Sequence, residues 1–201
     1  MTTGLHFDAE AHVYTLDGAR VPGVTEILSD LSAREYRFVD RAVMERTAWF
    51  GQAVHKVIEL DTASLLDESE LAPALVPYLD KWRQFLAQSG FTPIMSEQRV
   101  FSRRYGYAGT LDIAGELNMR RCVIDAKRCA SVPRTAGPQT AAYRIALDEM
   151  FPDFAPNGCD RYALHLTPSE TRGWTLVPFK NPNDARVFLS ALSLHNWSKA
   201  A

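Results

Sequence analysis

Two aspartates and a lysine are the residues with the clearest chemical potential in this sequence. Asp112 and Asp125 are 13 positions apart, and Lys127 follows Asp125 by two. The segment between the aspartates is typical of two strands, and a turn centred near Asn118 and Met119 would place the aspartates opposite each other. Opposed residues share a face of the sheet, with Cβ atoms about 4.5–5.5 Å apart, and Lys127 would point to that same face. Four apolar neighbours should point the other way, into the core: Leu111, Ile113, Ile124 and Ala126.

Two carboxylates at this distance repel each other unless a positive charge lies between them. A divalent cation with oxygen ligands is one solution, and Mg²⁺ retains water that can attack a phosphate. A neighbouring lysine can position that water or stabilise developing charge. The alternative is a strand with surface charges, in which Asp125 and Lys127 form an ordinary ion pair. A site is favoured because the segment Cys122–Lys127 is otherwise apolar, so charges within it need a reason.

Hydrophobic periodicity and turn residues predict the elements around this group. We expect a β-hairpin over residues 5–21, turning at Asp17 and Gly18, and then a short helix, residues 26–31, capped by Thr25. Further helices are expected over residues 34–63 (interrupted or kinked near Gly51), 70–88 (ended by Gly90), 139–150 and 183–197. Strands are expected over residues 94–101, 105–116, 121–127, 161–166 and 173–178. This order predicts an α/β fold with a mixed central sheet flanked by helices.

Length and composition are those of an ordinary globular protein, with 201 residues, 46% of them hydrophobic. We expect one domain, with the hairpin and helices in residues 1–90, the sheet core in 91–180 and a terminal helix in 181–201. Three scattered cysteines argue against a disulfide framework. We find neither a signal-peptide pattern nor an apolar run of membrane-spanning length, so an intracellular, cytoplasmic protein without a membrane partner is expected.

Charge is unevenly distributed along the chain. Residues 96–144 contain nine Lys/Arg and four Asp/Glu, a net charge of +5, whereas the rest of the chain has a net charge of −7. A basic middle segment can attract a polyanion. On charge alone, chance clustering on a solvated face explains the pattern equally well.

Four short motifs follow one another along the chain: Gly51–Glu59, Gly109–Asp112, Val123–Lys127 and Gln139–Tyr143. The ordered set resembles the PD-(D/E)XK nuclease superfamily, and within it the RecB-like exonuclease branch. The segment Pro22–Leu28 also looks like phage-type members and mitochondrial genome maintenance exonucleases. Each motif alone is weak, and the resemblance rests on their order.

The resemblance implies a restriction-endonuclease-like mixed sheet and a Mg²⁺ or Mn²⁺ ion at Asp112 and Asp125. It implies that Lys127 is the catalytic lysine and that His55 is a further metal ligand, where residue type alone would favour a histidine packed in the core. The third motif carries Asp125 where many members carry glutamate, and the shorter side chain demands a closer approach to the metal. The four-cysteine iron–sulfur cluster of some relatives is excluded by the cysteine spacing.

Two acidic residues are expected to support the site. Glu59 lies one helical turn beyond His55 and could orient His55 or Lys56, or could be a solvated helix residue. Glu97 begins the strand before Asp112 and could approach the metal from the side.

Three further residues are expected to support the site or contact DNA. The resemblance implies that Gln139 and Tyr143, one helical turn apart, hold DNA or the active site; plain amphipathic helix residues are the alternative. Arg128 stands where a small hydroxyl residue often follows the lysine, and it either binds phosphate or points to solvent.

These features together predict a Mg²⁺- or Mn²⁺-dependent DNA nuclease. An exonuclease is favoured, acting on single- or double-stranded DNA with free ends in phage or prophage DNA processing, recombination or repair. Two alternatives stay open. One is a catalytically inactive DNA-binding module that retains the fold. The other is a partner-dependent subunit that trims ends for a recombinase, a helicase or a single-strand-binding partner.

Overall fold

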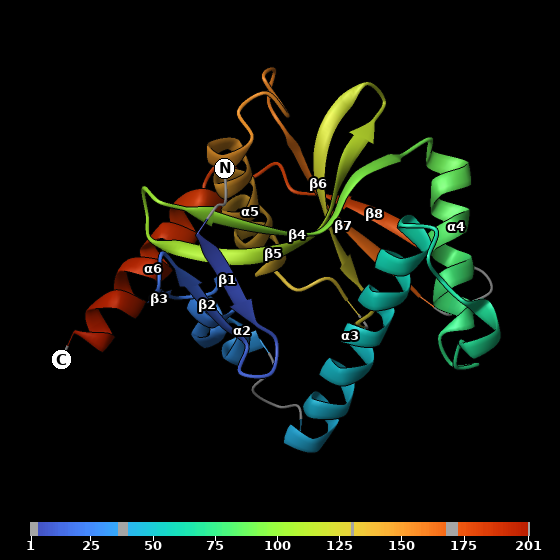
Figure 1. The fold of residues 1–201 in the computed structure, drawn as a ribbon, viewed down its shortest axis with the longest axis horizontal. Helices are drawn as coiled ribbons and strands as arrows, with labels where there is room; N and C mark the ends of the chain where they lie inside the picture. Colours follow the sequence, from blue (N-terminus) through green and yellow to red (C-terminus); the bar gives the residue numbers. More distant parts are fainter. Residues whose placement is uncertain (1–3, 36–39, 130, 168–172, 201) are drawn as a thin grey trace.

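A five-stranded mixed sheet forms the centre of the molecule (Figure 1). The computed structural model describes residues 4–35, 40–129, 131–167 and 173–200, and the side chains of all of these except 41–46. The strands run in the order β4 (Thr92–Ser102), β5 (Tyr107–Leu117), β6 (Arg120–Lys127), β7 (Asp160–Leu166) and β8 (Trp174–Pro178). Only the β6–β7 pair is parallel, and α5 (Ala136–Met150) makes the crossover that parallel neighbours require. The predicted mixed sheet is confirmed, and each strand ends within two residues of its predicted limits.

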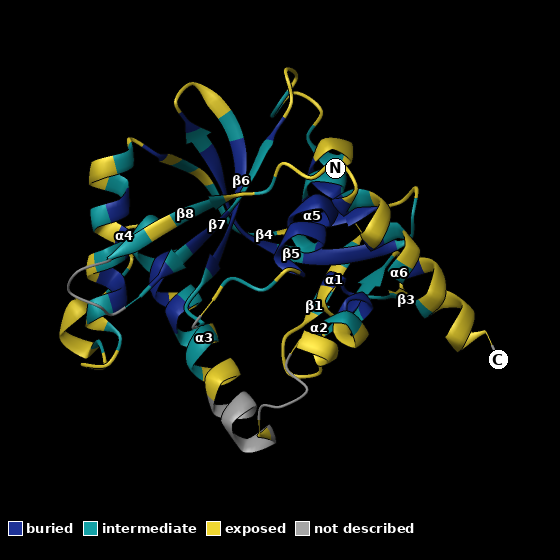
Figure 2. Cartoon of the chain, turned by 180° about the vertical axis from the view of Figure 1, so that it is seen from behind, coloured by how far each residue is buried: buried dark blue, intermediate teal, exposed yellow. Residues whose placement is uncertain are grey.

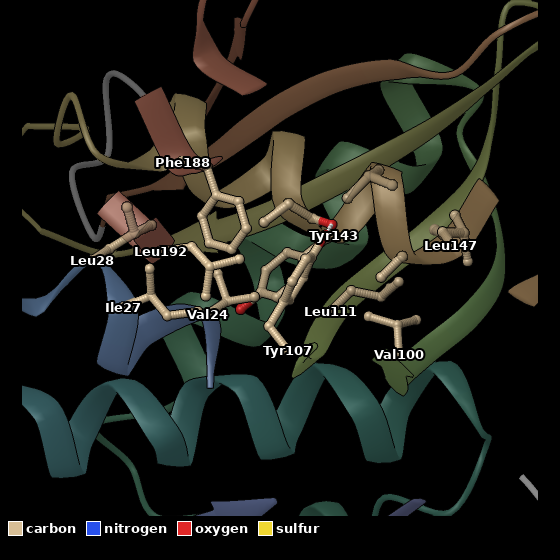
Figure 3. Packing of buried hydrophobic residues seen from close by; sticks show 14 of the residues in the cluster. Val24, Ile27, Leu28, Val100, Tyr107, Leu111, Tyr143, Leu147, Phe188 and Leu192 are labelled. Carbon is tan, nitrogen blue, oxygen red and sulfur yellow. Dashed lines mark hydrogen bonds between the residues drawn. The ribbon is translucent and has the colours of Figure 1, made fainter. Parts of the chain in front are cut away.

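Helices cover both faces of this sheet, as predicted. On one face lie α1 (Val24–Ile27), α5 and α6 (Asp184–Lys199); on the other lie α3 (Arg41–Thr62) and α4 (Val76–Ser89), which follows a short 3₁₀ turn (Glu68–Glu70). Figure 2 shows the most deeply buried segments in the sheet and on the helix faces turned toward it. On the α5 side Phe188 meets Tyr107 edge to face (Figure 3), and on the α3–α4 side Trp82 and Phe85 are fully buried. These two apolar layers hold the sheet rigidly in place.

The N-terminal segment forms a small three-stranded sheet rather than the single hairpin that we predicted. Its strands are β1 (Leu5–Asp8), β2 (Val13–Leu16) and β3 (Ala19–Val21). The predicted turn at Asp17 and Gly18 is present, with φ values of 51° and 83°. The missed turn before β2 contains no glycine or proline; the Asp8 carboxylate organises it by accepting the amides of two following residues.

Two short helices replace the predicted helix over residues 26–31. The first, α1, begins at Val24, and Gly23 rather than Thr25 is its N-cap. The backbone amide of Gly23 donates to the carboxylate of Glu26, which supplies the cap that a threonine side chain was expected to provide. The second, α2 (Ser29–Glu35), follows after one residue.

The longer helices differ from prediction mainly at their beginnings. Helix α3 runs without interruption through Gly51, so the predicted interruption there is wrong, and a kink stays a prediction. Helix α4 begins at Val76 with Pro77 in its first turn, because a proline is tolerated there and not further inside a helix. It ends at Gly90, with φ 70°, as predicted. Helix α5 begins three residues early and includes Pro138, whose missing amide is not needed in a first turn. No helix in the described parts of the chain is long and apolar enough to cross a membrane.

Halfway along β4 and β5, the side chains that pointed to one face of the sheet begin to point to the other. Ile113 packs in the α3–α4 layer, whereas Leu111, two residues earlier, packs in the α5 layer. Strict alternation would put both on one face, so the prediction that Leu111 shares a face with Ile113 is wrong. The change coincides with Glu97, which lies opposite Asp112 and has φ 47°. This left-handed conformation is unusual for a residue other than glycine and stores backbone strain.

Candidate active site

A two-residue turn sets the register of the two aspartates. Asn118 and Met119 both have positive φ, 49° and 61°, as in the tight turns that match the twist of a hairpin. The pairing of β5 with β6 continues to residues 113 and 124, so that the next opposed pair is Asp112 and Asp125. The predicted turn and the predicted register are therefore both found.

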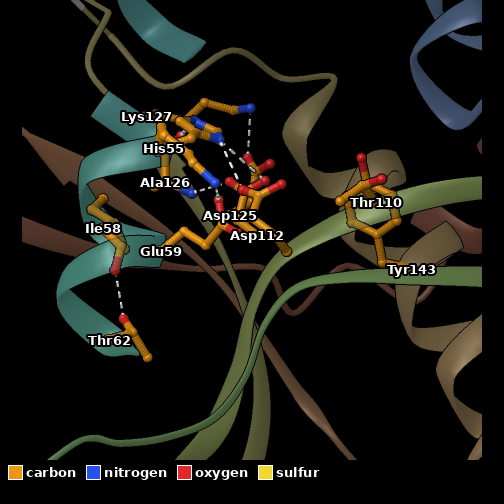
Figure 4. Close-up of polar contacts among 12 residues, drawn as sticks. His55, Ile58, Glu59, Thr62, Thr110, Asp112, Asp125, Ala126, Lys127 and Tyr143 are labelled. Atoms are coloured by element: carbon orange, nitrogen blue, oxygen red, sulfur yellow. Dashed lines mark hydrogen bonds and ion pairs between the residues drawn. The ribbon is translucent and has the colours of Figure 1, made fainter. Parts of the chain in front are cut away.

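The ladder between the two strands ends at Ile113 and Ile124, so the strands separate at the aspartates, and side chains fill the opening. The backbone amide of Ala126 donates to Oδ2 of Asp112 at 2.7 Å. The Lys127 ammonium lies 2.7 Å from Oδ2 of Asp125, which places these two charges together as the sequence predicted. Asp125 is 1% exposed and Asp112 is 9% exposed, so both carboxylates are withdrawn from bulk water. Figure 4 shows their side chains together with those of Lys127 and His55.

His55 reaches this group from α3, on the far side of the strand opening. Its Nδ1 is 3.4 Å from Oδ1 of Asp112 and 3.8 Å from Oε1 of Glu97. Its Nε2 is 3.1 Å from the carbonyl oxygen of Ala126. His55, Glu97 and Asp112 each offer one ligand atom, and these atoms lie within 4.8 Å of one another.

The ligand set therefore differs in one member from the predicted one. His55 and Asp112 are together as expected, but Glu97 lies in the third position, where we expected Asp125. Asp125 is turned to Lys127 instead, and its role as a metal ligand stays a prediction. Glu97, Asp112 and Asp125 form a row of three carboxylates across β4, β5 and β6.

Burial and crowding of like charges shift the pKa values of this group. Burial and the neighbouring Asp112 carboxylate raise the pKa of Glu97 to about 7, and burial raises that of Asp125 to about 6. Burial lowers the pKa of His55, but the Asp112 carboxylate outweighs it and raises the pKa to about 9. Burial also lowers the pKa of Lys127, but Asp125 and Asp112 raise it above its usual value. The site thus holds more negative charge than its own cations neutralise.

Helix α5 holds the lysine from the other side. Lys127 Nζ donates to Oε1 of Gln139 at 3.4 Å, and Nε2 of Gln139 donates to the Tyr143 hydroxyl at 3.2 Å. The Tyr143 ring lies so close to Gly109 that a Cβ there would be 2.7 Å from a ring carbon. Only glycine permits this approach. Gln139 and Tyr143 thus adjoin the site, and their contact with DNA stays a prediction.

The other two predicted supporting residues are held by neighbours on α3. Glu59 borders the site and accepts a hydrogen bond from Lys56 at 2.7 Å. Arg128 donates to the carbonyl of Thr47 at 2.7 Å, and its guanidinium lies 4.7 Å from the centre of the Phe50 ring. Arg128 therefore braces β6 against α3 in this structure, and a contact with phosphate stays a prediction.

The site opens into a cleft of about 740 Å³, a size typical of ligand-binding sites. Helix α3 lines one side and the β1–β2 hairpin lines the other. Tyr14 on β2 donates to or accepts from the hydroxyl of Thr110 at 2.9 Å, two residues from Asp112. Sequence reasoning missed Tyr14, because nothing in the hairpin indicates contact with a strand almost 100 residues later.

Comparison with known proteins identifies no family. No family model matches the sequence, and no curated protein matches it. Among solved structures, the chain is similar to the crystal structure of a candidate exonuclease from Eubacterium rectale, with 9% sequence identity and a TM-score of 0.48. The match covers 75% of this chain and 64% of that one, less than two thirds of its length. A match at this level bears on neither the site nor its chemistry.

Proposed function

We propose that this chain is a metal-dependent DNA nuclease of the PD-(D/E)XK type. The observation that carries the proposal is the position of Asp112, which belongs to a cluster of possible metal-ligand atoms and lines the same open cleft as Lys127. Hydrolysis of a phosphodiester needs a cation near the phosphate and an activated water. The cleft provides access, and the residues around Asp112 provide the charge.

The side chains present fit a divalent cation. Two carboxylates and one imidazole nitrogen form a compact ligand set at Glu97, Asp112 and His55, of the kind that Mg²⁺ or Mn²⁺ accepts. Oδ1 of Asp125 is buried and has no hydrogen-bond donor among the described residues, so one more carboxylate oxygen lies close by. A bound Mg²⁺ or Mn²⁺ would supply Lewis acidity and lower the pKa of its water.

Lys127 acts as a cation in this proposal. Burial lowers the pKa of the ammonium, but Asp125 and Asp112 raise it above its usual value, which favours the charged form. The ammonium donates hydrogen bonds to the attacking water or to a phosphate oxygen on which negative charge develops. Gln139 limits the movement of the ammonium, and Tyr143 in turn holds Gln139.

The substrate follows from this chemistry. A cation-binding carboxylate cluster beside a fixed ammonium suits a polyanion that brings its phosphate to the metal. We propose DNA with free ends as the substrate and exonucleolytic cleavage as the reaction, in phage or prophage DNA processing, recombination or repair. A DNA-binding module without cleavage, or a subunit that needs a partner, is the competing proposal.

The test is cleavage of end-labelled linear DNA with Mg²⁺ or Mn²⁺, with closed circular DNA in parallel. The wild type should degrade linear DNA, chelator should stop it, and Lys127→Ala should be at least about 100-fold slower. Lys180→Ala, an exposed lysine that does not line the cleft, is the matched control and should cleave normally. Thermal melting of each variant separates loss of activity from loss of fold. Equal cleavage by Lys127→Ala, or none by the wild type with either metal, would contradict the proposal; degradation of circular DNA would exclude a pure exonuclease.

A further inference from the structure

A row of three aromatic rings lines the cleft on the side of the N-terminal sheet. The rings of Phe7 and Tyr14 are stacked, with centroids 4.5 Å apart, and His12 meets Phe7 edge to face at 5.2 Å. All three residues line the cleft. Tyr14 is buried, Phe7 is half-buried and His12 is exposed. The row therefore leads outward from the strand that carries Asp112, to which Tyr14 is tied through Thr110.

The outer end of this row is held in place by its own turn. Oδ1 of Asp8 accepts the backbone amides of Glu10 and Ala11, both at 3.0 Å. His12 has φ 52°, a conformation that brings the chain sharply back into β2. Phe7 and Tyr14 are also direct partners in the β1–β2 ladder. The rings are thus presented in a fixed orientation, which lowers the entropy cost of binding a flat ligand.

Cations and another ring lie on the elements that border the cleft, although Lys56 is the member of this group that lines it. The guanidinium of Arg99 lies 5.4 Å from the centre of the Phe7 ring. On the opposite side Lys56 lines the cleft, with 59% of its side chain exposed. Trp49 lies two turns before Lys56 on α3 and is 69% exposed. Figure 1 shows α3 and the β1–β2 hairpin projecting on the same side of the central sheet. His12 and Trp49 are the exposed rings of this group. Exposed rings near positive charges are typical of sites that bind unpaired nucleic acid strands.

We propose that the Phe7–His12 row is a stacking platform for the unpaired bases of a DNA strand whose phosphates lie toward the carboxylate cluster. This inference rests on the proposed nuclease function and adds the substrate class, which is single-stranded DNA or a frayed end. In a duplex each base is stacked within the helix and presents only its edges in the grooves. An unpaired strand presents base faces, and any base can stack on an aromatic ring. The platform therefore selects single-stranded over double-stranded DNA without selecting sequence.

Binding without cleavage tests the platform directly. Fluorescence anisotropy in chelator would compare a short oligodeoxythymidylate, an abasic strand of the same length and a blunt duplex of the same length. The wild type should bind the oligodeoxythymidylate about 10-fold more tightly than either comparison strand, as expected for stacking of a base on a ring. Phe7→Leu and His12→Ala should bind all three ligands alike. Trp197→Leu is the matched control, because Trp197 is 78% exposed on α6 and does not line the cleft.

The two variants, together with their melting temperatures, separate loss of stacking from loss of folding. Phe7 packs partly against the small sheet, so Phe7→Leu should loosen it. His12 is exposed, so His12→Ala should lower the melting temperature only slightly, by the cost of alanine at a positive φ. Unchanged base preference in His12→Ala, or equal wild-type affinity for duplex and oligodeoxythymidylate, would overturn the platform. Base-dependent binding without cleavage in Mg²⁺ would retain the platform and refute the nuclease. Cleavage without base-dependent binding would support the nuclease and refute the platform.

Discussion

Two groups of buried charges lie on the neighbouring strands β6 and β7, where Arg161 is the partner of Val123, two residues before Asp125, and they are built differently. At the start of β7, Arg161 pairs with Asp184 at 2.9 Å, and both side chains are about one tenth exposed. The same guanidinium donates to the carbonyl oxygens of Gly137, Phe179 and Asn181. One cation meets one carboxylate there, and further acceptors use the remaining donors. A buried pair of this kind is neutral and satisfied.

The group at the end of β6 is neither neutral nor satisfied. Three carboxylates lie beside two cations, the Lys127 ammonium and the His55 ring, whose pKa is raised to about 9. Oδ1 of the buried Asp125 has no donor among the described residues, and Glu97 has a strained backbone. The first group has a structural role alone, because its charges and hydrogen-bond groups satisfy one another. The second has one carboxylate more than it has cations, so a bound cation would balance it. Unbalanced buried charge in a cleft is thus a better indicator of a functional site than buried charge itself.

Removing one partner from the balanced group should have the largest effect on stability. Arg161→Met leaves the Asp184 carboxylate and three carbonyl groups without their donor, and we expect the free energy of unfolding to fall by about 3 kcal/mol. Urea denaturation measures this. Arg120→Met is the matched control, because the neighbouring Arg120–Asp160 pair is exposed and should contribute less than about 1 kcal/mol. Equal stability of the two variants would show that the buried pair contributes no more than the exposed pair.

Removing a carboxylate from the unbalanced group should raise, rather than lower, the free energy of unfolding. In chelator, Glu97→Gln removes one of three crowded carboxylates, so the free energy of unfolding should rise by roughly 1 kcal/mol. Cleavage in Mg²⁺ should fall about 100-fold, because a ligand atom loses its charge. Glu116→Gln, near the far end of β5 and paired with Arg121, is the control for both measurements. A variant that loses stability while it keeps full activity would show that Glu97 is structural.

A third group, with cations in excess, should respond only weakly. Lys199 and Arg20 both pair with Glu26, a third of whose side chain is exposed. Partial burial raises the pKa of Glu26, but Lys199 and the amide of Gly23 hold it below its usual value. A carboxyl group with a lowered pKa stabilises the fold above its unfolded pKa of about 4.3 and loses that effect as the pH falls through its folded pKa.

Glu26→Gln should therefore destabilise the fold by about 1 kcal/mol or less at pH 7. The difference from wild type should shrink as the pH falls below about 4.3 and should disappear once the pH is below the lowered pKa of the folded carboxyl group. Melting temperatures across this pH range measure the effect, and the exposed Glu10→Gln is the control. A difference that persists at low pH would mean that the shape of Glu26, rather than its charge, stabilises the helix cap.

Part of the site was predictable from local sequence because local rules determine it. The two-residue turn at Asn118 and Met119 sets the register, and the register alone places Asp112 opposite Asp125. The period of two along a strand then brings Lys127 to Asp125. His55 is different, since its contact with Asp112 joins segments 57 positions apart. Only the resemblance to a family predicted it.

The rest depended on conformations that residue types do not reveal. Glu97 adopts positive φ although glutamate has no preference for it, so neither the change of facing in β5 nor the burial of Leu111 on the α5 side followed from alternation. Tyr14 reaches the cleft because the N-terminal sheet packs against the end of β4 and the start of β5, at Phe101 and Ala108. Such packing depends on tertiary contacts, which overrule local patterns.

The continuous meander of β4, β5 and β6 has a consequence for the order of folding. Its antiparallel contacts are local, so they can form early and rapidly, whereas the parallel pairing of β6 with β7 must wait for α5. The three carboxylates and Lys127 all lie on this meander, but His55 arrives only when α3 docks. The electrostatic repulsion therefore already opposes the folding transition state. A cation that binds with the help of His55 would bind only after the transition state. We therefore expect it to slow unfolding and to leave the folding rate almost unchanged.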